Sequence, residues 1–392
     1  MENLNDDGPG SLRAALESDF PRTILFRTGG TIELSRDLVI ASPFVTVAGQ
    51  TAPGHGVTLK NASLVIQTHD VLVRYLRVRP GDGTGPAGED RDGIKVLGRD
   101  SGGETYNVVI DHVSVSWATD ENISIWYDAH DVTVSSSIIA EGLYYSIHPE
   151  KPHSMGLITG PQATRISLLR NLMFNNNARN PFVTGGALQV VNNVIVNWGV
   201  LGTDARGREQ SIHANIVGNS YLPGVRTNLG GSPLQLYCES DQYHLSGNEG
   251  RFPDGSLRRD WELVTAGGGL TSRAGRAVDL FAAPQATVLS AAEAFEAVVG
   301  QSGARVPFTD PVDQRIVVST RGQEGEAVSS PQDVGGYPSL EPGAAPLDRD
   351  SDGIPDGDDR LPEDSENALR DLNGDGYNEL EEYIDGLLPG AG

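Results

Sequence analysis

The chain has 392 residues, 38% of them hydrophobic and 6% aromatic, which suffices for one large domain with an appendage and a core of small aliphatic side chains. Its formal net charge of −24 makes nucleic acid a poor partner, and no apolar run is long enough to cross a membrane. The single cysteine, Cys238, excludes an internal disulfide, and the opening residues Met1 to Leu4 do not resemble a signal peptide. We expect a secreted, monomeric protein whose export signal is not part of this sequence, with a cytoplasmic protein as the alternative.

The first predicted element is a short helix over residues 11–17 (SLRAALE), which Ser11 can cap. Short segments that alternate Val or Ile with polar residues follow at 44–47, 70–73, 107–110, 131–134, 165–168, 187–190 and 209–212. The second residues of these segments are 26, 37, 24, 34, 22 and 22 positions apart. A base period in the low twenties with occasional insertions is typical of stacked coils, whereas helical repeats would show a 3.6-residue periodicity. The sequence therefore predicts an all-β fold, a right-handed parallel β-helix, with the helix over 11–17 covering its first open end.

Asparagines follow several of these segments at comparable positions: Asn171, Asn192, Asn193 and Asn215. Asn tolerates the left-handed backbone of tight turns, and stacked Asn side chains can hydrogen-bond along the axis of the coils. We expect an asparagine ladder at these positions.

The two long intervals contain insertions, and insertions in a solenoid become loops on one face, often the face that binds a ligand. The first insertion holds Asp90 and Asp92, and the second holds Lys151. These loops are the predicted place of a functional site.

After the strands, Ser290 and Glu293 form a capping box that begins a second short helix, for which Gly300 is a plausible end. Residues 319–346, rich in Gly, Ser and Pro, are predicted to form a linker. The predicted domains are thus a β-helix over 1–318, a linker over 319–346 and a small module over 347–392.

The last 52 residues include 16 acidic and 3 basic residues and carry more than half of the net negative charge. Residues 371–382 (DLNGDGYNELEE) have the spacing of an EF-hand calcium loop, with Gly376 at the sharp turn. Residues 348–359 offer a companion loop, and the pair resembles the calcium repeats of dockerins. The predicted Ca²⁺ ligands are Asp348, Asp350, Asp352, Asp356 and Asp359 in the first loop and Asp371, Asn373, Asp375, Glu379 and Glu382 in the second.

Four short motifs together carry a resemblance to a known family: residues 47–54 (VAGQTAPG), 110–112 (IDH), 117–122 (WATDEN) and 178–181 (ARNP). With them, the chain resembles the pectate lyases of polysaccharide lyase family 1, in particular a bacterial branch with a calcium-loop tail. The resemblance implies cleavage of pectate (polygalacturonate), an acidic polysaccharide, by β-elimination with Ca²⁺ as the cofactor.

The resemblance also implies roles for single residues. Arg179 matches the catalytic base of the family, which takes the proton from C5 of a galacturonate. A free guanidinium is protonated at any working pH, so this role requires nearby cations that favour its neutral form. Lys151 matches the substrate-binding lysine of the family, and His148 and His153 flank it, where they could contact sugar.

Asp90, Asp92 and Asp120 match the calcium ligands of the family. Where the family has a further acidic ligand, this chain has Ser124, and Glu121 is expected to take its place. Calcium prefers several oxygen ligands, including carboxylates, so the tightness of this site depends on that replacement.

Thr184 stands where many relatives have an additional substrate-binding arginine. This departure keeps two alternatives open: a lyase that acts on another uronic-acid polysaccharide, and a β-helix that binds polysaccharide without catalysis. A glycoside hydrolase would need paired carboxylates beyond Asp90 and Asp92.

Overall fold

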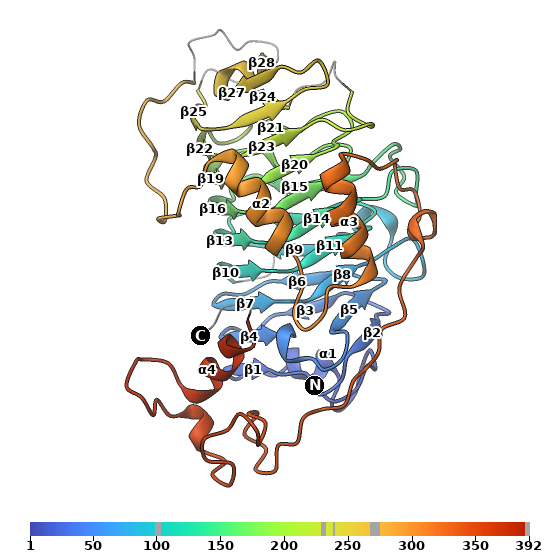
Figure 1. The fold of residues 1–392 in the computed structure, drawn as a ribbon, viewed down its shortest axis with the longest axis vertical. Helices are drawn as coiled ribbons and strands as arrows, with labels where there is room; N and C mark the ends of the chain where they lie inside the picture. Colours follow the sequence, from blue (N-terminus) through green and yellow to red (C-terminus); the bar gives the residue numbers. More distant parts are fainter. Residues whose placement is uncertain (99–102, 229–232, 238–239, 267–274, 389–392) are drawn as a thin grey trace.

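The computed structural model describes residues 1–98, 103–228, 233–237, 240–266 and 275–388, so Cys238 lies outside the described part of the chain. Three sheets, whose strands are all parallel except the last of sheet B, wind into an elongated β-helix, and each full coil contributes one strand to each sheet in turn (Figure 1). The predicted parallel β-helix is confirmed.

We call the three sheets A, B and C, and within the described residues they contain the following strands. Sheet A consists of β1 (Arg22–Ile24), β4 (Val45–Ala48), β7 (Val71–Arg74), β10 (Tyr106–Asp111), β13 (His130–Ser135), β16 (Thr164–Leu169), β19 (Gly186–Val191), β22 (Ile212–Val217) and β25 (Gln242–Ser246). Sheet B consists of β2 (Gly30–Glu33), β5 (Val57–Lys60), β8 (Arg77–Arg79), β11 (Ser114–Ser116), β14 (Ile138–Ala140), β17 (Leu172–Phe174), β20 (Val194–Val196), β23 (Ser220–Leu222), β26 (Glu249–Arg251) and β27 (Leu257–Arg259). Sheet C consists of β3 (Leu38–Ile40), β6 (Leu64–Ile66), β9 (Ile94–Leu97), β12 (Glu121–Trp126), β15 (Met155–Thr159), β18 (Phe182–Val183), β21 (Thr203–Ala205), β24 (Leu234–Leu236) and β28 (Val264–Ala266).

The register of sheet A confirms six of the seven predicted segments. Their second residues stand opposite one another on neighbouring strands as one buried column: Val45, Val71, Val108, Val132, Ile166 and Leu188. The next partner of Leu188 is Ala214, so the predicted segment 209–212 is wrong and the strand begins only at Ile212. Glu209 and Gln210 are exposed in the loop before it, because that segment has a single apolar residue to bury.

A ladder of buried asparagines runs along the coils. It consists of Asn171, Asn193, Asn219 and Asn248, with Nδ2–Oδ1 distances of 3.0, 3.1 and 2.8 Å between successive members. Asn192 and Asn215, which the sequence placed in the ladder, instead hydrogen-bond the backbone of residues 289 and 281 on the outside of the coils. Each ladder amide also donates to a backbone carbonyl of the preceding coil, so buried polar groups in the turn are satisfied.

Two predicted helices are present. Ser11 caps α1 (Leu12–Leu16), whose leucines are buried at the N-terminal end of the β-helix, as expected of a cover for the first coil (Figure 1). α2 (Ala291–Gln301) begins with the capping box at Ser290, runs one residue past Gly300, and lies along sheet B beside β20 and β23. Short 3₁₀ turns form η1 (Gly49–Thr51), η2 (Gly88–Asp90) and η4 (Asp260–Glu262).

A buried ion network fastens α3 (Pro311–Gly322) to sheet B. The Arg79 guanidinium contacts the carboxylate of Asp310, with one Nη2–Oδ1 distance of 3.1 Å, and that of Asp313 at 2.7 Å, and all three side chains are buried. Burial alone would raise the pKa of Asp310, but the Arg79 guanidinium outweighs it and lowers the pKa to about 2. The predicted domain boundary at residue 318 falls inside this helix.

The predicted linker packs against the coils. Residues 323–346 include η5 (Pro331–Val334), and the Tyr337 hydroxyl donates to the Arg79 carbonyl at 2.8 Å. The Tyr337 ring also meets the buried Trp117 edge-on, with 5.1 Å between centroids. This segment therefore packs on the outside of sheet B, and its role as a linker between two domains stays a prediction.

The acidic module lies beside the first coils and contains η6 (Asn367–Leu369) and α4 (Glu379–Gly386) (Figure 1). Ion pairs join it to the β-helix at Arg27–Asp348 (3.3 Å) and Arg74–Asp385 (2.8 Å). A cavity of about 620 Å³ lies between the module and the N-terminal strands.

Candidate active site

Three carboxylates converge where two neighbouring strands of sheet C begin. Asp92 precedes β9, Asp120 precedes β12, and Glu121 is the first residue of β12. One oxygen from each lies within 4.8 Å of the others, and Asp92 and Glu121 are buried. Parallel strands in register bring the residues before them to the same place, so the β-helix itself assembles this group.

Arg91 shapes the loop that carries Asp92. Its buried guanidinium donates to the carbonyls of Gly81 (3.0 Å) and Gly83 (2.9 Å), and also to Pro86. Its own carbonyl accepts the backbone N–H of Asp120 at 3.3 Å. The first insertion therefore wraps around one arginine, which also ties it to the adjacent coil.

Arg179 reaches the carboxylate group from the other side. It lies between β17 and β18, has a positive φ of 60°, and forms an ion pair with Glu121. Its carbonyl accepts the N–H of Leu157 at 2.6 Å, and a Cβ at Gly156 would lie 2.4 Å from that carbonyl. Glycine at 156 is therefore required for the close approach that fixes the arginine.

The electrostatics of the group favour an added cation. Burial raises the pKa of Asp92 to about 7, with Asp120 adding to the shift and Lys95 and Ser124 opposing it. Burial lowers the pKa of the Arg179 guanidinium from its ordinary value, whereas Asp120 and Asp92 act in the opposite direction. A hard divalent cation beside these converging carboxylates would stabilise the ionised form of Asp92.

The carboxylates line an open groove of about 520 Å³ along sheet C. Asp90 also lines it but is exposed at the end of η2 and lies outside the close group of carboxylates. Asp90 is thus the last residue of a 3₁₀ turn, whereas Asp92 belongs to the close group of carboxylates. Ser124 donates a hydrogen bond to Asp92 and so orients its carboxylate.

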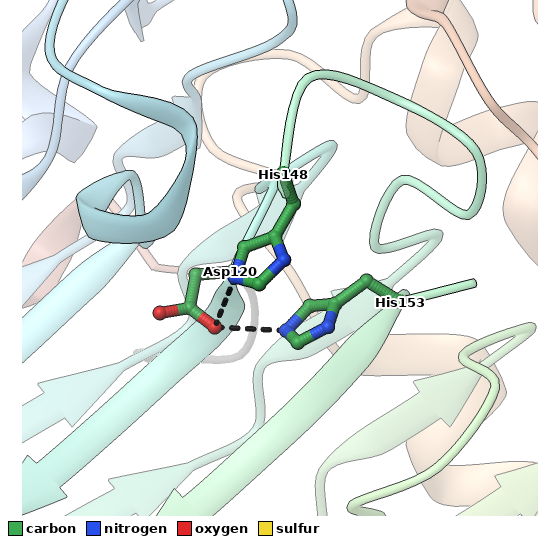
Figure 2. A group of neighbouring side chains, drawn as sticks. All are labelled: Asp120, His148 and His153. Carbon is green, nitrogen blue, oxygen red and sulfur yellow. Dashed lines mark hydrogen bonds and ion pairs between the residues drawn. The ribbon is translucent and has the colours of Figure 1, made fainter. Parts of the chain in front are cut away.

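Two histidines from the loop between β14 and β15 contact the same group. His153 Nε2 lies 2.9 Å from Asp120 Oδ1, and His148 Nε2 lies 3.7 Å from it (Figure 2). The two imidazoles are buried and stacked, with 3.7 Å between centroids. Lys151 lies in the same loop with an exposed side chain, and its contact with substrate stays a prediction.

Sequence reasoning missed a set of cations around Phe182, whose ring lies 5.9 Å from the Arg179 guanidinium carbon, 5.6 Å from that of Arg206 and 5.8 Å from that of Arg208. Arg206 forms an ion pair with Asp204 at 2.8 Å, whereas Arg208 is exposed. The signal available in the sequence was a pair of arginines one coil after Arg179.

The backbone also links Arg208 to the position where an arginine is missing. Its N–H donates to the Thr184 carbonyl at 3.0 Å. The Thr184 side chain is buried and donates to the Thr159 carbonyl at 3.0 Å, so it does not face the groove.

A second candidate metal site lies in the acidic module. Asp348, Asp350 and Asp352 each place an oxygen within 4.8 Å of the others. Within residues 347–388, the buried carboxylate oxygens without a hydrogen-bond partner belong to these three aspartates, to Asp356 and to Asp359. These are the five residues that the loop spacing predicted, so the oxygens fit a cation.

The second predicted loop is more exposed. Asp371 accepts backbone N–H groups of Gly374 (2.6 Å) and Gly376 (2.9 Å), the turn geometry expected of a calcium loop. Glu379 and Glu382 form ion pairs with Arg360 at 2.8 and 3.0 Å, so these ligands are engaged elsewhere. Asn373 and Asp375 are exposed, and the ligand roles in this loop stay predictions.

Comparison with known proteins gives the chain its relatives, although no family model matches it. A protein named "Probable pectate lyase C" from Aspergillus oryzae is 36% identical over 403 residues, which cover 100% of this chain and 89% of that protein. A protein of the same name from Aspergillus fumigatus is 35% identical over 404 residues, which cover 99% of this chain and 89% of that protein. Among solved structures, the major allergen from cedar pollen has a TM-score of 0.55 at 17% identity and covers 77% of this chain and 86% of its own, a likeness of fold alone.

A β-helix with these relatives is a polysaccharide lyase. At 36% identity over its whole length, the chain belongs to the pectate lyase family. In the described residues, the helices are all too short or too polar to span a bilayer.

Proposed function

We propose that the chain cleaves pectate by β-elimination, with Arg179 as the base and Ca²⁺ held by Asp92, Asp120 and Glu121. The observation that carries this proposal is the ion pair between Arg179 and Glu121, because Glu121 converges with Asp92 and Asp120 and all three carboxylates line one groove. A uronic acid bound there places its carboxylate against positive charge and its C5 proton against a nitrogen base.

The donor set supports calcium in particular. All three side chains offer carboxylate oxygens, which Ca²⁺ prefers, and Ser124 orients one of them. A bound Ca²⁺ would withdraw charge from the substrate carboxylate and so make the C5 proton more acidic. Asp90, exposed at the rim of the groove, is a peripheral ligand in this proposal.

Arg179 performs the proton transfer in this mechanism. Burial already lowers the pKa of its guanidinium, and the opposing effect of Asp120 and Asp92 weakens when a cation neutralises them. The neutral guanidine takes the proton from C5, the C5–H electrons form the C4–C5 double bond, and the C4–O bond breaks. The leaving oxygen keeps the electron pair of the broken C4–O bond and takes a proton from solvent water, while Arg179 later returns its proton to solvent. No water is added across the bond.

The remaining parts of the proposal concern the rest of the chain. Lys151 and His153 lie in the loop beside the carboxylates and would bind the sugar acid. The module over 347–392 would bind Ca²⁺ through its first loop and, with the ligands described above, through its second. We also propose that the protein is a monomer, that it is secreted and acts on a plant polysaccharide, and that it belongs to the bacterial branch of the family.

The test is the ultraviolet absorbance of unsaturated uronide ends, measured with polygalacturonate and Ca²⁺ with and without chelator. We expect Arg179→Lys to lower kcat by about 10²–10⁴-fold, the range for loss of a positioned base. Arg165→Lys is the matched control, since Arg165 is exposed and paired with Asp131 at 2.7 Å on sheet A. Equal loss in both variants, or no absorbance from wild-type protein, contradicts the proposal.

A related substrate is the second candidate, favoured by the buried Thr184. The same absorbance assay with a panel of other uronic-acid polysaccharides decides between them, because every such lyase leaves the same kind of unsaturated end. If another uronan is cleaved faster than polygalacturonate, that uronan is the preferred substrate, and the proposed β-elimination still holds.

A further inference from the structure

Asp120 has two sets of neighbours, one of carboxylates and one of histidines. On one side lie Asp92 and Glu121, which offer oxygen ligands. On the other side lie His148 and His153, which offer imidazole nitrogens (Figure 2). One ligand atom each from Asp120, His148 and His153 lies within 4.8 Å of the others.

We infer that Asp120, His148 and His153 bind a divalent transition metal ion of the Zn²⁺, Co²⁺ or Ni²⁺ class. Imidazole nitrogen with one carboxylate oxygen is the donor set of these ions, whereas Ca²⁺ takes oxygen ligands. This site is distinct in chemistry from the group of three carboxylates, although the two share Asp120.

The distances suit such an ion. Ligand atoms at about 2.0–2.1 Å from a tetrahedral metal lie roughly 3.3–3.5 Å from one another. The observed separations from Asp120 Oδ1, 2.9 Å to His153 Nε2 and 3.7 Å to His148 Nε2, bracket that range. The rings are tilted by 15° with 3.7 Å between their centroids, so a small further tilt makes the two nitrogens converge.

The loop holds both rings in place for this purpose. The backbone of Glu150 holds His148 Nδ1, because its N–H donates to Nδ1 at 3.0 Å and its carbonyl lies 3.0 Å away. Nε2 is therefore the nitrogen that faces Asp120. The N–H of His153 donates to the Tyr144 carbonyl at 2.8 Å, and the N–H of Tyr144 to that of Val328 at 2.7 Å. Both histidines are buried, 6% and 3% exposed, which a single hydrogen bond to Asp120 does not require.

The Asp120 carboxylate belongs to both groups of ligand atoms. A transition metal that captures Asp120 withdraws it from the carboxylate group, so the two cations compete. This competition rests on the proposed calcium site, but binding of the transition metal does not.

The test uses the full chain, freed of metal, titrated with Co²⁺ and read by the visible d–d absorption of coordinated cobalt. We expect a band in wild-type protein and a Kd for Co²⁺ raised about tenfold or more in His148→Ala and in His153→Ala, at least the loss seen for weaker supporting groups. His148→Gln and His153→Gln, which keep more of the packing, should show the same loss. His130→Ala is the matched control, because His130 also lies beside a carboxylate, 2.7 Å from Asp131, and stacks on Tyr106.

The outcomes separate this inference from the proposed function. A wild-type titration without a band, or a band unchanged in both Gln variants, overturns the metal site whatever the lyase activity. A band lost in the histidine variants but kept in His130→Ala supports it even if polygalacturonate is not cleaved. Where polygalacturonate is cleaved, Co²⁺ should raise the Ca²⁺ concentration needed for half-maximal activity in wild-type protein and not in the histidine variants.

Discussion

At the scale of single residues, the groove combines groups whose neighbours change their ordinary chemistry. Arg179 is half-buried beside carboxylates, Asp92 is a buried carboxylate whose pKa is raised to about 7, and Asp120 is shared between oxygen and nitrogen neighbours. Such perturbed groups in a cleft mark a functional site more strongly than residue type does.

We expect Arg208→Ala to raise KM for polygalacturonate by about two- to fivefold with little change in kcat, since one exposed charge pair contributes about 0.2–1 kcal/mol. Arg208 is exposed beside Phe182 and the buried Thr184, so it supplies the positive charge that Thr184 lacks. The increase should shrink at high salt, which screens exposed charges. Arg170→Ala, an exposed arginine at the edge of sheet A, is the control, and an equal rise there would contradict a specific role.

The two aspartates of the first insertion give a paired comparison. We expect Asp92→Asn to raise the Ca²⁺ concentration for half-maximal activity more than about tenfold, because a buried ligand charge is lost. Asp90→Asn should shift it less, because Asp90 lies outside the close group. Activity measured across a Ca²⁺ titration decides, and a larger shift in the Asp90 variant would place the cation elsewhere.

At the scale of elements, the insertions and the segments outside the coils decide what the repeated strands can do. Arg91 folds one insertion, the stacked histidines lie in the other, and α3 is held by charges that the β-helix buries. A buried pair is costly to break because the remaining charge stays unpaired.

We expect Asp310→Asn to lower the free energy of unfolding by about 3–5 kcal/mol near neutral pH, leaving Arg79 short of a partner and weakening the cap of α3. The Asp310 pKa is lowered to about 2, so its stabilisation is present above the unfolded pKa near 3.8 and is lost as the pH falls through 2. The difference between wild type and variant should therefore narrow below pH 4. Denaturant unfolding at several pH values measures it.

Asp313→Asn is the comparison for that experiment. Burial and the neighbouring Asp310 raise the pKa of Asp313, so its ionised form contributes less and its loss should cost less. A cost independent of pH in the Asp310 variant would show that the helix cap, and not the ion pair, dominates.

At the scale of the whole molecule, the end of the chain returns to its beginning. The acidic module contacts the first coils through Arg27 and Arg74. Ile354 is buried within the loop over 348–359, whose aspartates include buried oxygens without a hydrogen-bond partner. Clustered carboxylates repel one another, and burial together with nearby aspartates raises the pKa of Asp352.

We expect removal of calcium to loosen this module and expose it to protease, because the repulsion then lacks a counter-charge. Asp350→Asn should make residues 347–388 protease-sensitive even with Ca²⁺ present. Asp358→Asn, an exposed neighbour outside the predicted ligand set, should stay protected. Limited proteolysis with and without chelator is the measurement, and protection that is independent of Ca²⁺ in every variant would exclude a calcium-held module.

Local patterns predicted the repeat, the first helix and part of the asparagine ladder. Motif resemblance singled out Arg179 and the three carboxylates of Asp92, Asp120 and Glu121, which the fold brings close together. Periodicity works here because each coil buries the same kind of side chain at the same position. The periodicity gave the wrong position at residues 209–212 and at Asn215. The insertion before β22 shifts the strand by four residues, so that Ala214 and not Gln210 pairs with Leu188, and no local sequence pattern indicates this shift.

Contacts between distant segments were decided only by the tertiary structure. These contacts join residues far apart in the chain. They are the ion pair of Arg79 with Asp310, the packing of Tyr337 on Trp117, the contact of His148 and His153 with Asp120, and the contact of residues 347–388 with the first coils. Sequence spacing determines which side chains one coil places on each sheet. Which distant charges pair depends on the entropy of loop closure and on the free energy of burying polar groups, and both depend on the whole folded structure.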